Sequence, residues 1–302
     1  MVKYDHPEIF WCQYVIGTVI KNSSTGCAKN VILNYVMDKK EIERRQKQIS
    51  RAVKDFMKGI NTSMSDYEVA LRAHENIIER IDYDSIGLDE QDRDSSSYKK
   101  PDNLRSIYGV FVEKKAVCAG YAFAFQYLLR CAGIESAYVV GPCHSGGLHA
   151  WSMVKLEGDY YYVDVTFDDA SNTDEKKNHN EGPSYDYFCI TSEELYKSRK
   201  LDNPEWYPEC TATKCNYFVR SGLLLKSYDT DKLTSGIRRA YESGKDSVSF
   251  KFENEQLYRL ACRRLFDNGE AFDVLQAAGC KMNNYRYRKN DELYTVRIFF
   301  KK

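Results

Sequence analysis

The sequence lacks any excess of charge of one sign. Lysine and arginine together number 44, aspartate and glutamate also number 44, and the formal net charge of the 302 residues is zero. A protein that binds nucleic acid or an anionic membrane surface electrostatically normally carries a basic excess. The composition gives no support for either partner, and we predict no nucleic-acid binding.

Long apolar runs are also missing. No segment reaches the roughly 20 apolar residues of a membrane-spanning helix, and no charged and then apolar leader opens the chain. The ten cysteines are scattered, and a chain of this length can build a core without disulfides. We therefore expect no membrane span and a cytoplasmic location. Secretion is the alternative if the chain is shortened at its start, because a strand-like pattern begins within the first dozen residues.

Motifs for a metal or an organic cofactor are missing as well. Asp168, Asp169 and Asp174 belong to an acidic loop, but their spacing does not fit a calcium-binding EF-hand. Cys210 and Cys215 have the wrong separation for a zinc knuckle and no second ligand pair. We predict no metal and no cofactor.

Alternating helical and strand-like patterns indicate an α+β protein. Residues 9–20 and 29–37 form a predicted β-hairpin, a helix follows over 38–59, and Ser65 with Glu68 forms a capping box that opens a second helix. The pattern changes again near residue 227. We predict an N-terminal hairpin and helix over 1–64, a catalytic core over 65–226 and a small α+β subdomain over 227–302.

The most informative stretch is Ala116–Arg130, in which Cys118 begins an apolar helix. The N–H groups and the positive dipole end at a helix N-terminus stabilise a thiolate and lower the pKa of a cysteine there. Gly120 follows, and we expect its missing side chain to leave room above the sulfur. Apolar residues lie on nearly all sides of the helix, and Gly133 supplies its end. We therefore predict that the helix is buried in the centre of the domain.

Two later strand-like segments carry His149 and Asp164. Residues of one parity point to the same side of a strand, so His149 and Trp151 share a face. If both segments belong to one antiparallel pair, contact between His149 and Asp164 requires a connection longer than two residues or a bulge. We therefore predict strands over 149–156 and 160–167, joined by a wide turn at 157–159.

A cysteine, a histidine and an aspartate that meet in space can carry out acyl transfer. His149 would take the thiol proton, Asp164 would fix the imidazole tautomer, and the thiolate would attack a carbonyl to form a thioester. The backbone N–H of Cys118 is a natural oxyanion donor. Tyr108 is a candidate second donor, with core packing as the alternative, and Trp151 is a candidate wall of the site.

These segments resemble the transglutaminase-like superfamily, most closely its bacterial members, which are often described as cysteine proteases. The resemblance lies in Val-Cys-Ala-Gly-Tyr-Ala at Cys118, His-Ala-Trp at His149 and Tyr-Val-Asp-Val-Thr-Phe-Asp at Asp164. It is specific over about residues 65–195. It implies a papain-like core, in which a central Cys-bearing helix packs on an antiparallel sheet, with Cys118 as nucleophile, His149 as base and Asp164 as orienter. Phe167 departs from the pattern, since many relatives have tryptophan there.

Three functions are consistent with this sequence. The first is a cysteine peptidase or amidase that acts on a peptide, a protein or a cell-wall peptide. The second is a protein–glutamine crosslinking transferase, which differs in that an amine rather than water reaches the thioester. The third is a non-catalytic interaction module that binds through the C-terminal subdomain. The presence of all three candidate catalytic residues favours an enzyme over the non-catalytic module. The triad does not separate the first two functions, and we take the peptidase or amidase as the main hypothesis.

Overall fold

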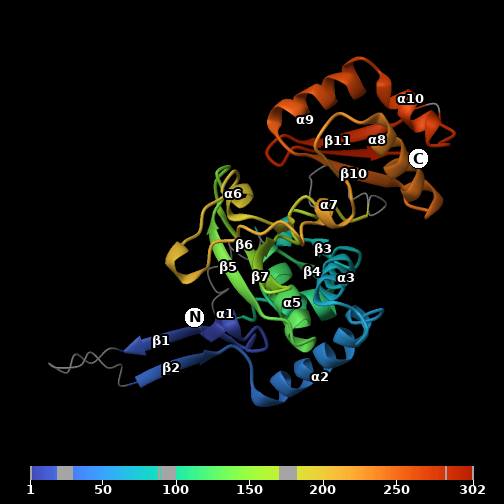
Figure 1. Ribbon diagram of the computed structural model, residues 1–302. Coiled ribbons are helices and arrows are strands. Elements are labelled where there is room, and N and C mark those ends of the chain that lie inside the picture. Colours follow the sequence, from blue (N-terminus) through green and yellow to red (C-terminus); the bar gives the residue numbers. More distant parts are fainter. Residues whose placement is uncertain are drawn as a thin grey trace. The chain divides into compact units, whose positions relative to one another are not determined.

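The computed structural model of the chain describes residues 2–18, 30–87, 89, 100–169, 182–282 and 284–300. The chain divides into two compact units, one of Met1–Val140 with His149–Met153 and one of Gly141–Leu148 with Val154–Lys302. Both units combine helices and strands, which confirms the predicted α+β class (Figure 1). None of the described helices is long and apolar enough to cross a membrane.

The first unit begins with a short helix and a β-hairpin. The helix α1 covers Val2–Asp5, and β1 (Cys12–Thr18) pairs antiparallel with β2 (Asn30–Tyr35). This pairing confirms the predicted hairpin, whose loop lies outside the described residues. The amphipathic helix α2 (Lys39–Phe56) follows, and the side chain of Asp38 caps its first turn.

The next helix, α3 (Asp66–Ile78), starts at the predicted capping box. The Ser65 hydroxyl accepts a hydrogen bond from the Glu68 N–H at 3.3 Å, and the Glu68 carboxylate accepts one from the Ser65 N–H at 2.8 Å. Asn76 of α3 donates to the Phe56 carbonyl of α2 at 2.7 Å. The apolar stripe of α3 is buried and consists of Val69, Ala73 and Ile77.

Several tight turns fix the point at which the cysteine-bearing helix begins. The π-helical turn η2 (Gly109–Glu113) is followed by Lys114, which has a φ of 60°. The two-residue strand β4 (Lys115–Ala116) then pairs in parallel with β3 (Asp82–Tyr83). The helix α5 (Cys118–Cys131) starts two residues later.

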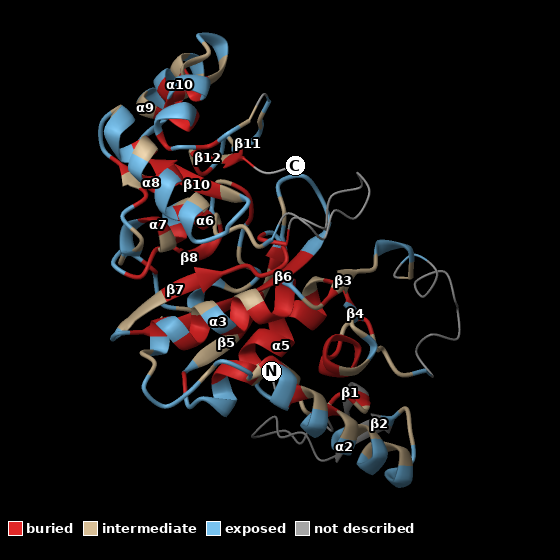
Figure 2. Ribbon diagram, turned by 90° about the vertical axis from the view of Figure 1, so that its right-hand side faces the viewer, coloured by how far each residue is buried: buried red, intermediate tan, exposed pale blue. Residues whose placement is uncertain are grey.

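The helix α5 is buried, as its composition predicts (Figure 2). Gly133, just past its end, has a φ of 79°, the left-handed conformation of a helix C′ residue. A Cβ at Gly120 would lie 2.7 Å from the Leu104 carbonyl oxygen and 2.8 Å from the Ala116 Cβ. The open space expected beside Gly120 is therefore filled by the Leu104 backbone, and the glycine permits this close approach.

The helix α5 packs on two strands of a sheet. The Phe123 ring stacks on the Tyr138 ring of β5 (Ser136–Pro142), with 4.1 Å between centroids. The Ser152 hydroxyl of β6 (Leu148–Leu156) donates to the Ala122 carbonyl at 3.4 Å. The predicted packing of the cysteine-bearing helix on a sheet is thus present in the first unit.

The sheet has the strand order β5-β6-β7-β8. Only Glu157 and Gly158 connect β6 to β7 (Asp159–Val163), and their φ values are 52° and 90°. Two left-handed residues are typical of the tightest hairpin loops, so the wide turn predicted at 157–159 is wrong. The predicted strand over 160–167 is also too long, because the chain turns after Val163.

The segment after β7 returns to the sheet and then forms a short helix. The strand β8 (Phe188–Ile190) pairs antiparallel with β7. The helix α6 (Ser192–Leu195) begins with a capping box formed by Thr191 and Glu194. A 3₁₀ turn, η5 (Pro204–Trp206), follows in the irregular stretch.

The C-terminal part of the second unit is a second four-stranded sheet with helices. Its strand order is β11-β12-β10-β9. Its elements are α7 (Tyr217–Arg220), β9 (Leu224–Leu225), α8 (Thr230–Glu242), β10 (Ser247–Phe252), α9 (Glu255–Cys262), the π-helical turn η6 (Arg263–Asp267), α10 (Glu270–Ala277), β11 (Arg286–Asn290) and β12 (Thr295–Phe299). Phe250 of β10 and Ile298 of β12 point into a core shared with α8, α9 and α10.

The opposite face of this sheet is polar and contacts the segment around α6. Lys251 forms a buried ion pair with Glu194 at 2.5 Å, and Asn290 donates to the Asp186 carboxylate at 3.2 Å. Burial alone would raise the pKa of Glu194, but the Lys251 ammonium and hydrogen bonds hold that pKa below its ordinary value. The boundaries predicted at residues 65 and 227 stay predictions.

We predict that Gly120→Ala destabilises the protein by about 1–3 kcal/mol, because the new methyl group would collide with the Leu104 carbonyl. Thermal denaturation followed by circular dichroism measures the effect. Gly133→Asn is the matched control on the same helix, since nothing lies within 4 Å and asparagine tolerates a C′ position. Equal melting temperatures for Gly120→Ala and the wild type would contradict the close approach.

We predict that Lys251→Met lowers the unfolding free energy at pH 7 by about 2–4 kcal/mol, because it leaves the Glu194 carboxylate buried without its cation. The depressed pKa of Glu194 stabilises the wild type above about pH 4, and this contribution disappears as pH falls through the folded-state value. The difference between the two proteins should therefore shrink in acid. Urea unfolding at pH 7 and at a pH below about 4 measures this difference. Lys226→Met, which removes the cation of the exposed Lys226–Glu253 ion pair, is the control.

Candidate active site

Cys118 is the first residue of α5 and is half-buried. The first N–H groups of a helix have no acceptor within the helix. The N-cap residue is Val117, and no side-chain hydrogen bond from it caps the first turn. Cys118 therefore lies where backbone N–H groups and the helix dipole favour a thiolate.

Other cysteines of the chain are poor thiolates. Burial raises the pKa of Cys131, Cys189, Cys210, Cys215, Cys262 and Cys280. The pKa of Cys210 reaches about 12. Cys131 is the best internal comparison, because it is the last residue of α5 and is exposed overall although partial desolvation raises its pKa. The two ends of one helix thus carry a thiol that the dipole favours as an anion and one that it disfavours.

His149 lies on β6 and is buried. Its ring stacks on the ring of Trp151 with 5.9 Å between centroids and 24° between planes. The two residues share a strand face, as predicted from their parity. Trp151 is itself only 1% exposed, so its observed contribution is to pack against the imidazole.

Asp164 lies in the turn that follows β7 and is 1% exposed. Its Oδ1 accepts hydrogen bonds from the backbone N–H groups of Thr166 at 3.1 Å and Phe167 at 3.0 Å. These bonds form an Asx turn, in which an aspartate side chain mimics a backbone carbonyl. The Oδ2 atom accepts from the Arg199 guanidinium in a buried ion pair. The direction of the carboxylate is therefore set by its own turn and by Arg199.

Arg199 was not predicted, although it is the charged partner of Asp164. It follows α6, is fully buried, and lies 35 residues after Asp164 in the sequence. Its guanidinium lies 4.1 Å from the centroid of the Phe167 ring and 4.9 Å from that of the Tyr187 ring. No local motif marks such a residue, because its role depends on a contact between distant segments.

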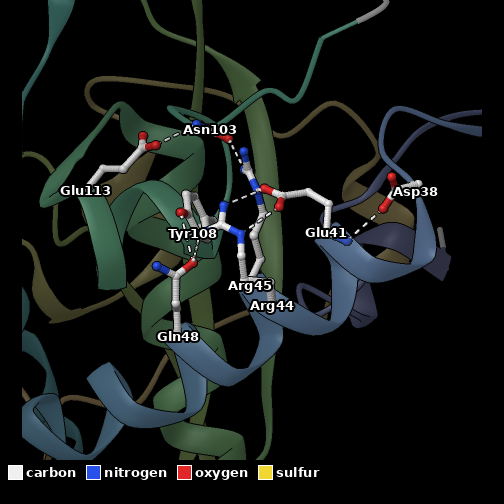
Figure 3. Close-up of polar contacts among 8 residues, drawn as sticks. All are labelled: Asp38, Glu41, Arg44, Arg45, Gln48, Asn103, Tyr108 and Glu113. Atoms are coloured by element: carbon white, nitrogen blue, oxygen red, sulfur yellow. Dashed lines mark hydrogen bonds and ion pairs between the residues drawn. The ribbon is translucent and has the colours of Figure 1, made fainter.

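The Tyr108 side chain contacts two residues of α2 (Figure 3). Its hydroxyl donates to the Gln48 side chain at 3.2 Å, and the Arg45 guanidinium lies 4.1 Å above its ring. The Arg45 side chain also donates to Asn103 and to Glu41. These contacts agree with core packing, and the oxyanion role of Tyr108 stays a prediction.

Cys118 and His149 belong to the first unit and Asp164 to the second. Their assembly into one site stays a prediction. Residues 54–165, which contain all three, match the family model described as the transglutaminase-like superfamily. Residues 54–165 thus form a transglutaminase-like segment. The resemblance noted in the sequence and the transglutaminase-like core expected from it are confirmed over this segment.

Relatives of the chain share only part of it. A stretch of 102 residues is 33% identical to "Kyphoscoliosis peptidase" from Homo sapiens and equally to that from Mus musculus. It covers 30% of this chain and 14% of each relative, so the chain spans a small fraction of their length. A solved structure described as "Crystal structure of a TGase" is 15% identical with a TM-score of 0.36, over 53% of this chain and 38% of its own.

We predict that a thiol-directed alkylating agent at pH 6.5 modifies Cys118 at least about tenfold faster than Cys131. The physical reason is that the N-terminus of α5 favours the thiolate, whereas the pKa of Cys131 is raised. Mass spectrometry of tryptic peptides measures both rates in one sample. Cys118→Ala should abolish the fast phase and Cys131→Ala should preserve it. Equal rates at the two ends of the helix would contradict an activated Cys118.

Proposed function

We propose that this chain is a thiol-dependent acyl-transfer enzyme and that it hydrolyses amide bonds in peptides. One observation carries the proposal: the transglutaminase-like segment contains Cys118, His149 and Asp164 in the order that the resemblance assigns to nucleophile, base and orienter. The name of the similar human protein, a peptidase, supports an amide substrate. The position of Cys118 at the start of α5 supports the nucleophile assignment.

The proposed reaction has two stages. In the first, His149 accepts the Cys118 proton, the thiolate attacks the amide carbonyl, and the N–H groups at the start of α5 stabilise the oxyanion. The imidazolium then returns its proton to the leaving amine, which departs as the thioester forms. In the second stage His149 takes a proton from water, the hydroxide attacks the thioester, and the acid is released with the thiol regenerated.

Asp164 has a defined part in this proposal. A carboxylate that accepts the second ring N–H of a histidine fixes the tautomer and stabilises the imidazolium. The buried, fully oriented carboxylate of Asp164 supports this role, because its direction is set before any substrate binds. An aspartate with a mobile side chain would lose this advantage on each turnover.

We predict that the protein cleaves members of a mixed peptide library and that Cys118→Ala abolishes cleavage. Asp164→Asn should reduce kcat by about 10³–10⁴, by analogy with other triads in which the wrong tautomer results. Liquid chromatography with mass spectrometry detects the new termini, and Cys131→Ala, which should cleave at the wild-type rate, is the control. Full activity of Cys118→Ala would exclude the proposed nucleophile.

The same experiment distinguishes hydrolysis from crosslinking. A primary amine added at millimolar concentration competes with water for the thioester. If the products are mainly acids, the enzyme is a hydrolase; if glutamine side chains acquire the amine, it is a transferase. Absence of both products together with a slow Cys118 would indicate a non-catalytic module.

A further inference from the structure

We propose that Arg199 is a positioning residue for the candidate active site, because it fixes the direction of the Asp164 carboxylate and pairs with its charge. The inference rests on the proposed function, in which Asp164 orients His149. Nothing in the family resemblance assigns a role to Arg199, and the residue lies outside the matched segment 54–165.

Hydrogen-bond donors approach both oxygens of the Asp164 carboxylate. An ionised carboxylate has two oxygens with about four acceptor positions. Two backbone N–H groups of the Asx turn bind Oδ1, and the Arg199 guanidinium binds Oδ2. Together they fix the plane of the carboxylate. In the proposed site the second acceptor position of Oδ2 would receive the N–H of His149, so Arg199 determines where that position points.

The backbone around Arg199 is fixed from two directions. Its N–H donates to the Leu195 carbonyl at 3.2 Å, and it forms an antiparallel bridge with Cys143 just after β5. A Cβ at Gly141 would lie 1.8 Å from the Lys200 carbonyl oxygen, so only glycine permits this approach of β5.

The guanidinium of Arg199 is fixed as well. It lies 4.1 Å from the Phe167 ring centroid and 4.9 Å from the Tyr187 ring centroid, and its Nε donates to the Ser198 hydroxyl at 3.1 Å. The Tyr187 hydroxyl accepts a hydrogen bond from Asn290 of β11 at 3.5 Å. The C-terminal sheet therefore helps to hold the Tyr187 ring in place. Because both the guanidinium and the backbone of Arg199 are held in place, Arg199 can define the direction of the Asp164 carboxylate.

The surroundings of the Asp164 carboxylate are acidic. Two further carboxyls, Asp168 and Asp169, are buried in the same turn, and the Asp168 carboxylate accepts from the Tyr187 N–H at 3.0 Å. Arg199 forms the buried ion pair with Asp164, whereas Lys197 lies over the Tyr294 ring. Loss of the guanidinium would therefore remove the positive charge paired with Asp164 and make this acidic turn more negative beside the proposed position of His149. That negative charge would stabilise the imidazolium and raise the pKa of His149.

A purely structural ion pair predicts something different. A buried pair often contributes little net stability, and removal of one partner destabilises the fold wherever the pair lies. Such a role would lower the melting temperature without a specific change at His149. A change in the pKa of the His149 ring therefore distinguishes a positioning role of Arg199 from a purely structural one.

The test is an NMR titration of the histidine rings in a Cys118→Ala background, which removes coupling between thiol and imidazole. The chain has five histidines, and His149→Gln identifies the resonance of interest. The exposed His6, which is paired with Glu8, is the internal reference. Four variants are compared with this background: Arg199→Gln, Arg199→Lys, Asp164→Asn, and Lys251→Met as the matched control, because it removes the cation of another buried ion pair in the same unit.

We expect Arg199→Gln to raise the pKa of His149 by about one unit and Asp164→Asn to lower it by about one unit. Lys251→Met should leave it unchanged. Arg199→Lys should keep the His149 pKa near its starting value, because the charge is retained. With Cys118 restored, Arg199→Lys should still slow peptide cleavage about tenfold, because an ammonium lacks the planar fork of the guanidinium.

The outcomes separate the two proposals. If Asp164→Asn moves the His149 pKa and Arg199→Gln does not, Arg199 is only structural and this inference is overturned while the proposed function stands. If Asp164→Asn has no effect on His149, the orienter assignment fails and the role of Arg199 fails with it. If Arg199→Gln does not fold, Arg199→Lys decides: cleavage at the wild-type rate overturns the inference, and slow cleavage with an unshifted His149 pKa supports it.

Discussion

The constraint on which the second unit depends is the burial of a carboxylate. Asp164 is 1% exposed, and an ionised carboxylate without compensating donors is too costly to keep in an interior. The compensation comes from the Asx turn on one oxygen and from Arg199 on the other. Arg199 in turn needs aromatic rings and the bridge to Cys143 just after β5. One buried charge thus connects β5, the turn after β7 and the segment after α6.

The C-terminal sheet belongs to the same network. Its apolar face forms its own core with α8, α9 and α10, whereas its polar face contributes Lys251 to Glu194 and Asn290 to Asp186. Burial raises the pKa of Asp186, which makes the hydrogen bond from Asn290 more important for its satisfaction. These contacts tie the C-terminal sheet to the segment around α6.

Local signals in the sequence predicted local structure well. The capping box at Ser65 and the glycine end of α5 are confirmed, because each depends on residues within one turn of backbone. The register argument for Asp164 failed for a related reason. It assumed that Asp164 lies in a strand, whereas the Asx turn with Thr166 ends β7 first. Arg199 was beyond prediction, since its contact with Asp164 exists only in the folded chain.

The ion pair also changes what each part of the proposed site must supply. In the proposed site a lone aspartate beside His149 would stabilise the imidazolium strongly, and the paired Arg199 guanidinium would weaken that effect. Each pKa unit lost in this way corresponds to about 1.36 kcal/mol. The thiolate–imidazolium pair must then draw more of its stability from the thiolate side, where Cys118 begins α5 and Val117 provides no side-chain cap. We therefore infer that orientation comes mainly from Asp164 and Arg199, and that thiol activation comes mainly from the helix. On this proposal the valine before Cys118 is an advantage, because a capping side chain would compete for the N–H groups that the proposed thiolate and oxyanion would use.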